Sequence, residues 1–202
     1  MTIDQPARRA VAARAASLLL RYPDAEVLAA VPTIIAALDG LPDHIARPLR
    51  TLAQHRVSTG ATDLETSYVE LFDLRRRCCL YLTWYTAGDT RRRGEALVGF
   101  AEAYRSAGLR VAADELPDFL PAVLDLAAHH DAGWRLLREH RIALDLLADA
   151  LAGVRSVYAQ AVRAVLEMMP VPRPADLVAA AQLAQAGPPQ EMVGLEPYGV
   201  AR

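Results

Sequence analysis

Residues 62–73 read Thr-Asp-Leu-Glu-Thr-Ser-Tyr-Val-Glu-Leu-Phe-Asp, and this stretch decides the fold class. Positions 62–65 form a capping box, in which two side chains satisfy backbone N–H groups in the first turn of a helix. Three larger apolar side chains then follow at helical spacing on one face: Tyr68, Leu71 and Phe72. The sequence predicts a helix that begins at this box, carries an aromatic face and ends near Arg75–Arg77, whose charges suit a helix C-terminus.

Helical periodicity continues on both sides of this stretch. Apolar residues recur at three- and four-residue steps, and Pro, Gly and short polar turns separate the periodic segments. Further helices are predicted over residues 7–21, 27–38, 43–55, 91–107, 117–128, 134–154, 155–169 and 175–185. Pro32 leaves the second segment open between two short helices and one bent helix. Residues 80–85 are open between a helix and a buried extended segment.

Several residues mark expected helix ends. Asp24 can cap the helix that follows Pro23, Gly108 ends the helix from about residue 91, and Pro117 suits the first turn of the next helix. The pattern therefore predicts an all-α protein, a single-domain helical bundle over residues 1–186. Residues 187–202, which begin with Gly-Pro-Pro, are expected to form a mobile tail.

Composition narrows the classes of function. With 202 residues, of which 53% are hydrophobic, the chain can bury the core of one domain. A net charge of -2 without a basic stripe does not favour nucleic acid as a partner. All 22 basic residues are Arg, so a P-loop lysine, a Schiff base and a lysine general base are excluded. Sequence motifs of catalysis are also missing, which favours a binding protein over an enzyme.

Cysteine and histidine give no sign of a disulfide framework or a metal site. Cys78 and Cys79 are neighbours, a spacing that suits reduced thiols in a cytoplasm. His129 and His130 point to different sides of a helix and have no partner at metal-ligand spacing, so we expect them, with His140, to face solvent. The apolar run at residues 18–20 is too short for a signal peptide or a membrane span. We therefore expect a soluble, cytoplasmic chain without a cofactor of its own and without membrane insertion.

Two groups of residues could form a binding surface. The apolar stripe of residues 68–72 continues with Leu80, Tyr81, Trp84 and Tyr85, and it is either ordinary core or one wall of a groove for a peptide helix. The acidic run of residues 114–118 either favours a helix N-terminus or meets a basic segment of a partner. Cations at residues 91–93 oppose the helix dipole, so we expect Asp89 or a partner to compensate them.

Four blocks of this sequence resemble the NarJ-type assembly chaperones of respiratory nitrate reductase, relatives of the TorD and DmsD chaperones. They run in the expected order: Leu-Leu-Leu-Arg-Tyr-Pro-Asp at 18–24, Tyr-Val-Glu-Leu-Phe-Asp at 68–73, the segment 80–94, and Glu-Leu-Pro-Asp at 115–118 followed by Leu120-Pro121. Phe119 departs from the histidine of several relatives. The resemblance covers about half of the chain, from Leu18 to Pro121.

The resemblance implies a chaperone that binds the apo catalytic (alpha) subunit of nitrate reductase through its N-terminal, leader-like peptide. It would permit insertion of the molybdenum cofactor into that subunit, prevent premature docking at the membrane, and then dissociate, as a monomer or weak dimer. Such a site needs an apolar groove with carboxylates at its rim. The expected peptide-binding residues are Tyr68, Leu71, Phe72, Leu80, Trp84, Tyr85, Glu115, Pro117, Asp118, Arg91, Arg92 and Arg93.

Two other functions stay open from the sequence. A permanent structural subunit of the reductase would need a large obligate interface. A carrier or enzyme acting on the molybdenum cofactor would need a pocket with convergent polar groups, and the missing phosphate-binding motifs do not favour it.

Overall fold

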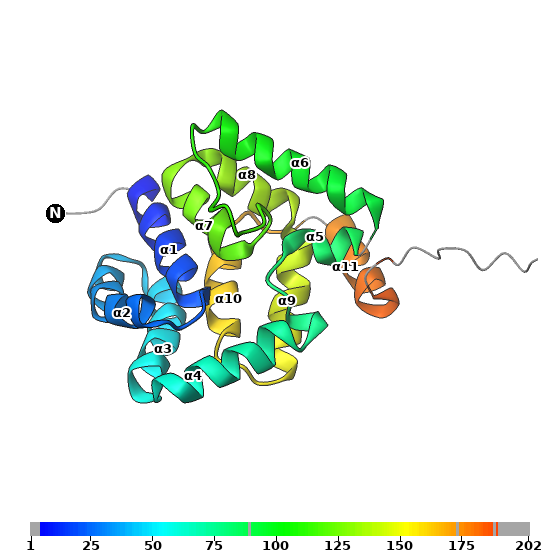
Figure 1. Cartoon of the computed structure of the whole chain (residues 1–202). Helices are drawn as coiled ribbons and strands as arrows, with labels where there is room; N and C mark the ends of the chain where they lie inside the picture. The colour runs from blue at the N-terminus through cyan, green and yellow to red at the C-terminus, as the bar shows by residue number, and fades with distance from the viewer. Residues whose placement is uncertain (1–4, 89, 173, 188, 190–202) are drawn as a thin grey trace, which may run out of the picture.

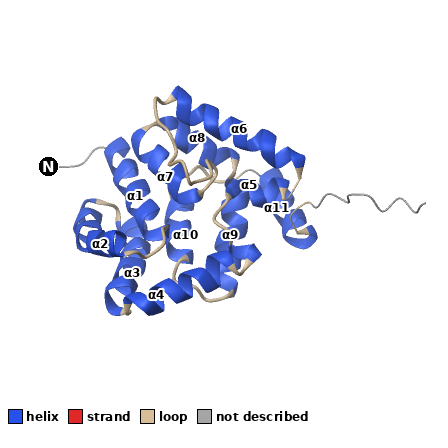
Figure 2. Cartoon of the chain, viewed as in Figure 1, coloured by secondary structure: helices blue, strands red, loops and turns tan. Residues whose placement is uncertain are grey.

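The computed structural model describes residues 5–88, 90–172, 174–187 and 189. Within these residues the chain is helical, as Figure 2 shows, and the sole pairing of extended backbone is an isolated antiparallel bridge between Tyr81 and Phe119. The prediction of an all-α protein is confirmed. The helices, in chain order, are α1 (Gln5–Leu20), α2 (Ala25–Ala37), η1 (Leu38–Gly40), α3 (Asp43–Ser58), α4 (Ala61–Tyr68), η2 (Val69–Asp73), η3 (Arg76–Cys78), α5 (Leu82–Ala87), α6 (Arg91–Ser106), α7 (Leu120–His129), α8 (Asp131–Glu139), α9 (Arg141–Gly153), α10 (Ala159–Glu167) and α11 (Pro174–Ala186).

Helix α10 lies near the centre of the bundle, and α1 lies beside it (Figure 1). Helix α1 packs against α7 and α3, and α10 packs against α3, α9 and α1. Its small residues let α1 approach its neighbours closely, since Ala12, Ala13 and Ala16 are fully buried. Helix α6 covers α8 on the outside, and α11 lies at the periphery against α9.

A buried arginine ties the end of α1 to α3. Arg56 is 3% exposed, and its guanidinium donates hydrogen bonds to the carbonyl oxygens of Leu19 and Arg21 at 3.0 and 2.7 Å. The hydroxyl of Tyr68 donates to the carbonyl of Leu20, at 3.0 Å. These donors satisfy carbonyls that a helix C-terminus leaves without partners. They also fix the direction in which the chain leaves α1 toward Tyr22.

Most of the predicted helix ends are close to the observed ones. Asp24 caps α2 by accepting a hydrogen bond from the backbone N of Val27 at 2.8 Å. Pro32 lies inside α2, which forms one helix and not two. Gly108 has a φ of +70° just after α6, where a left-handed residue ends a helix. Residues 80–85 contain both of the predicted alternatives, because extended backbone at Tyr81 is followed directly by α5.

The start of α4 was predicted wrongly. The helix begins at Ala61 with Gly60 as its N-cap and no side-chain cap, so Thr62 already lies inside it. Gly60 takes the extended conformation of an N-cap, and its carbonyl accepts from the backbone N of Leu64. The capping box is not formed because the chain enters the helix before Thr62.

Three further boundaries differ from the prediction. Pro117 precedes α7, whose first turn instead contains Pro121, because residues 118–120 are held by hydrogen bonds to residues 80–83. The segment 134–154 divides into α8 and α9 at His140. Arg155 has a φ of +55°, which delays the next helix to Ala159. Of the predicted tail, all but residues 187 and 189 lies outside the described residues.

Candidate functional site

An aromatic cluster forms where α4 gives way to a π-helical turn. Tyr68 ends α4, and residues 69–73 form the turn η2. The ring of Phe72 lies 4.6 Å from that of Tyr68 and 5.0 Å from that of Tyr158, and the Tyr22 ring meets Tyr68 edge-on at 5.5 Å. The wider π-turn places Phe72 and Asp73 at the surface of the core, and such turns are frequent at functional sites.

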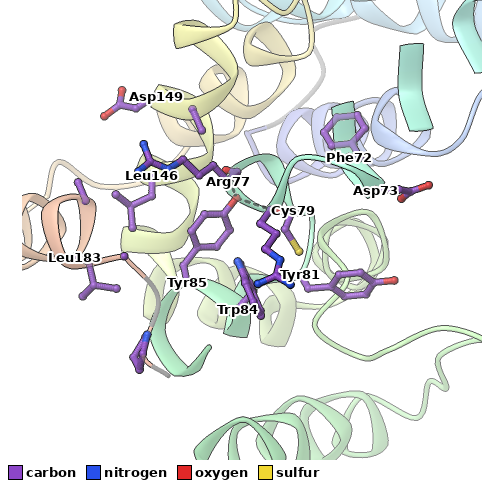
Figure 3. A pocket seen from close by; sticks show the side chains of 15 residues that line it. Phe72, Asp73, Arg77, Cys79, Tyr81, Trp84, Tyr85, Leu146, Asp149 and Leu183 are labelled. Carbon is purple, nitrogen blue, oxygen red and sulfur yellow. Dashed lines mark hydrogen bonds between the residues drawn. The ribbon is translucent and has the colours of Figure 1, made fainter. Parts of the chain in front are cut away.

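The segment that follows η2 is anchored by Tyr85. The Tyr85 hydroxyl lies 2.9 Å from the carbonyl oxygens of both Arg77 and Cys79, so its hydrogen can be shared between them. This contact holds η3 over α5, as the dashed lines in Figure 3 show. Tyr85 is 5% exposed, and burial raises the pKa of its hydroxyl far above the ordinary value. Tyr85 therefore acts as a neutral donor that shapes the surface between η3 and α5.

Asp118 is a structural residue and not a rim charge. It is fully buried, and its Oδ2 accepts hydrogen bonds from the backbone N and the hydroxyl of Thr83, at 3.0 and 2.5 Å. The Nε of Arg93 donates to the same hydroxyl at 3.3 Å. The carboxylate thus caps the first turn of α5 from a distant part of the chain. The expectation that Asp118 meets a basic segment of a partner is wrong for this conformation.

The larger of two neighbouring cavities lies between η3, α5, α9 and α11. It measures about 980 Å³. Figure 3 shows Tyr85 and Trp84 on one side and Leu146 of α9 and Leu183 of α11 on the other. The indole Nε1 of Trp84 is buried and has no hydrogen-bond partner among the described residues. The cavity is also lined by Phe72, Asp73, Arg76, Arg77, Tyr81 and Asp149.

The smaller cavity lies between the end of α1, η2 and the loop before α7. It measures about 320 Å³. Tyr22 stands at its mouth with 41% of its surface exposed. Burial raises the pKa of Glu115 above its ordinary value, and the neighbouring charge of Arg21 opposes this shift. The lining residues are Arg21, Tyr22, Asp24, Tyr68, Phe72, Asp73, Leu80, Tyr81, Glu115 and Phe119.

The two cavities adjoin, because Phe72, Asp73 and Tyr81 line both of them, and we call the two together the groove. Its floor is mainly aromatic, because Tyr68, Phe72, Tyr81, Trp84 and Tyr85 all line it. An aromatic floor with charged groups at its edges is the arrangement that binds one face of an amphipathic helix.

Only some of the expected site residues meet at the groove. Tyr68, Phe72, Leu80, Trp84, Tyr85 and Glu115 line it. Leu71 and Pro117 are half-buried and line neither cavity. Arg91 and Arg92 are exposed on α6 away from its lining, and Arg93 packs 5.9 Å from the centre of the Tyr81 ring. Asp89, the expected compensating charge, lies outside the described residues.

Sequence reasoning missed several residues that line the groove. Tyr22 and Asp24 both belong to the block at 18–24, but Asp24 was interpreted only as a helix cap and Tyr22 was given no role in the site. Arg76 and Arg77 were taken as a helix C-terminus. The walls from α9 and α11 carry no local signal, because Leu146 and Leu183 have the spacing of ordinary core residues.

Neither the thiols nor the histidines form a metal site in the part of the chain that the structure describes. Cys78 and Cys79 are free, and burial raises the pKa of both thiols. His130 caps α8 through its Nδ1, 3.1 Å from the backbone N of Ala132. His140 was expected to face solvent, but its ring lies 4.7 Å from that of Phe100 between α6 and α8. No helix among the described residues is long and apolar enough to cross a membrane.

Comparison with known proteins identifies the family. The profile of the family described as "Nitrate reductase delta subunit" matches residues 38–164, which is more than half of the chain. The chain belongs to the nitrate reductase delta subunit family. The matched region holds η2, η3, α5 and α9, so most of the groove lies inside it, while Tyr22, Asp24 and α11 lie outside it.

Individual relatives carry two kinds of name. The nitrate reductase-like protein NarX of Mycobacterium tuberculosis is 42% identical over 153 residues, which are 74% of this chain and 23% of NarX. This chain therefore spans under a quarter of that relative. The "Probable nitrate reductase molybdenum cofactor assembly chaperone NarJ" of Bacillus subtilis is 29% identical over 78% of this chain and 88% of its own length. NarJ of Escherichia coli K12, named as the same kind of chaperone, is 35% identical over 55% of this chain and 49% of its own.

A solved structure supports the fold. The crystal structure of a redox enzyme maturation protein from Archaeoglobus fulgidus superposes with a TM-score of 0.61 at 23% identity. The match covers 83% of this chain and 94% of that one. The match confirms the predicted all-helical fold.

Proposed function

We propose that this chain is an assembly chaperone that binds the apo catalytic subunit of a nitrate reductase through that subunit's N-terminal, leader-like peptide. By holding the subunit it permits insertion of the molybdenum cofactor and prevents premature docking at the membrane, and then it dissociates. The names of the NarJ relatives support the chaperone role. The observation that carries the peptide site is the aromatic groove with Asp24, Asp73 and Glu115 at its smaller cavity.

The groove suits a releasable complex. An amphipathic helix can lay its apolar side on Phe72 and Tyr81, while its basic residues meet the carboxylates. A peptide that folds only when it binds must offset the entropy of ordering, and this lowers its affinity. Moderate affinity is what a chaperone needs if it is to leave the finished enzyme.

Calorimetric titration tests the proposal. The ligand is a peptide of about fifteen residues, roughly four helical turns, from the N-terminus of the nitrate reductase catalytic subunit of the source organism. We expect a dissociation constant of about 1 μM or tighter. Tyr22→Ala should weaken binding about tenfold, because Tyr22 is 41% exposed at the groove and aromatic anchors dominate such interfaces.

The control removes an exposed apolar side chain elsewhere. Val98 is 57% exposed on α6 and does not line the groove, so Val98→Ala should leave the affinity unchanged. Both variants should melt within a few degrees of the wild type. If the wild-type protein binds the whole apo subunit but not the peptide, the contact does not lie between the groove and this peptide.

A permanent subunit of the reductase is the second candidate function. The description of the family as a delta subunit of nitrate reductase favours it. A permanent subunit should stay with the reductase in equal amounts through purification from the membrane, whereas a chaperone should be absent from the active enzyme. Quantitative mass spectrometry of the purified reductase separates the two.

A further inference from the structure

The two ends of the groove carry different charges. Asp24, Asp73 and Glu115 line the smaller cavity, and the one cation there, Arg21, is paired with Asp125 at 2.9 Å. The field at this end is therefore negative. A positive group placed over the smaller cavity meets carboxylates from three separate parts of the chain: α2's N-cap, η2 and the loop before α7.

The far end of the groove carries arginines. Arg76 and Arg77 line the larger cavity, and no carboxylate among the described residues lies within ion-pair distance of either. In Figure 3 the Asp73 carboxylate points away from Tyr85, on the side of Tyr81, whereas Arg77 extends toward Leu146. Asp149 also borders this cavity, but Figure 3 shows its carboxylate directed away from Trp84 and Tyr81. Two arginines and two carboxylates, Asp73 and Asp149, therefore line this end, whereas three carboxylates and one paired arginine line the other, so the larger cavity is the less negative of the two.

The two ends of a helix also carry different charges. Its first turn carries a partial positive charge and its last turn a partial negative charge. When the helix is the N-terminus of a protein, its free amino group adds a full positive charge to the first turn. Both charges favour placing the first turn near carboxylates and the last turn near arginines.

We propose that the groove binds the client peptide in one direction, with the peptide's amino end over the smaller cavity and its carboxyl end over the larger one. This inference rests on the proposed function and specifies the ligand further. The preferred ligand is a helix with a free amine or basic residues in its first turn and acidic residues in its last turn. Its apolar face crosses Phe72 and Tyr81, which both cavities share.

Changing charge at each end of the peptide tests the direction. Acetylation removes the positive charge of the amino end, and we expect it to weaken binding about threefold. An Asn→Asp exchange in the last turn adds a negative charge, and we expect it to strengthen binding by a similar factor. The opposite signs would mean the reverse direction. No effect at either end would mean that charge does not orient the peptide, and either result overturns the proposal.

Matched variants of the protein connect each effect to its end of the groove. The double variant Arg76→Gln/Arg77→Gln should abolish the preference for the acidic last turn, while Arg75→Gln, which lies beside the cavity without lining it, should keep that preference. Glu115→Gln should reduce the effect of acetylation, and the exposed neighbour variant Asp114→Asn should not. If Arg75→Gln and Asp114→Asn change the charge preferences as much as the cavity variants do, Arg76, Arg77 and Glu115 are not the residues that orient the peptide.

A spectroscopic measurement locates the ends directly. A nitroxide on the first residue of the peptide should broaden the NMR signals of Tyr22 and Phe119, and a nitroxide on the last residue should broaden those of Trp84 and Leu183. Exchange of the two patterns overturns the direction but leaves the proposed function intact. If none of the peptides binds, the proposed contact between the groove and the client's N-terminal peptide is itself contradicted.

Discussion

At the scale of single residues, polar groups inside the core hold the groove in place. The Tyr68 hydroxyl joins the π-helical turn to the end of α1 by donating to the Leu20 carbonyl. Arg56 makes the neighbouring contacts to α1, and burial lowers the pKa of its guanidinium. Because the chain continues from these carbonyls to Tyr22, they set the position of one edge of the groove.

Removing the Tyr68 hydroxyl should therefore destabilise the protein. We expect Tyr68→Phe to lower the free energy of unfolding by about 1–2 kcal/mol, since it leaves a buried carbonyl without its partner. The control is Tyr104→Phe, because the buried Tyr104 hydroxyl has no hydrogen-bond partner among the described residues. That variant should be neutral or more stable. Urea denaturation of both variants measures the difference, and equal losses would contradict the role of the Tyr68 hydrogen bond.

At the scale of elements, close approach between α7 and α8 depends on one glycine. A Cβ at Gly133 would lie 2.2 Å from the backbone N of Ala127 and 2.5 Å from its Cα, so backbone atoms would have to move. We expect Gly133→Ala to cost about 3 kcal/mol, at the upper end of the cost of overpacking. Gly99 lies within α6, and a Cβ added there would meet no atom within 4 Å, so Gly99→Ala should instead stabilise the helix by about 1 kcal/mol. Thermal melting of the two variants should show shifts of opposite sign.

The contact between α6 and α8 should make stability depend on pH. Burial against Phe100 lowers the pKa of His140 below its ordinary 6.5, and the charges of Glu139 and Asp118 only partly oppose this. The unfolded chain therefore binds a proton at a higher pH than the folded chain does. Stability should fall as the pH drops from 6.5 toward the folded-state pKa, and it should be constant above 6.5 for this group.

Comparison of two histidine variants isolates this effect. His140→Gln should flatten the loss of melting temperature as the pH falls below 6.5, because glutamine does not titrate there. His129→Gln changes an exposed histidine and should keep the wild-type profile. A His140→Gln profile parallel to that of the wild type would mean that His140 is protonated equally in both states.

Helix identities were predictable from the sequence, but contacts between distant segments were not. The periodicity of α1, α3, α6 and α10 reflects one buried face in each helix. The spacing of apolar residues within each segment is enough to predict that face. The residue at which α7 starts depends on contacts with a distant segment, because Asp118 turns inward to Thr83 and Phe119 pairs with Tyr81. The same contacts explain why Asp118 looked like a rim charge: an acidic residue before a helix gives no sign of which way its side chain turns.

At the scale of the whole molecule, the groove joins parts that no local pattern connects. Tyr22 follows α1, Phe72 lies in η2, Glu115 precedes α7 and Leu183 belongs to α11. The aromatic stripe could be predicted as core or groove, and it is both: Tyr68 and Tyr85 are buried in the core and also line the cavities. The dual role follows from size, since a large aromatic ring can pack inward with one face and border a cavity with its edge.

The periphery of the bundle gives a final prediction. Helix α11 packs against α9, and Leu183, Ala184, Gly187 and Pro189 form one wall of the larger cavity. A chain that ends at residue 172 should keep its helical fold, because α1 and α10 make their main contacts with helices other than α11. Its melting temperature should fall by only a few degrees. Its affinity for the client peptide should fall several-fold, because the larger cavity loses its apolar wall.

The matched control for this truncation is a chain that ends at residue 189, which keeps the whole wall and removes only residues outside the described part. It should bind the peptide as tightly as the full chain does. A peptide shortened by its last turn should not distinguish the two truncated chains, because it no longer reaches the larger cavity. Tighter binding by the chain that ends at residue 172 would contradict the prediction, since it would mean that α11 competes with the peptide for the groove instead of completing it.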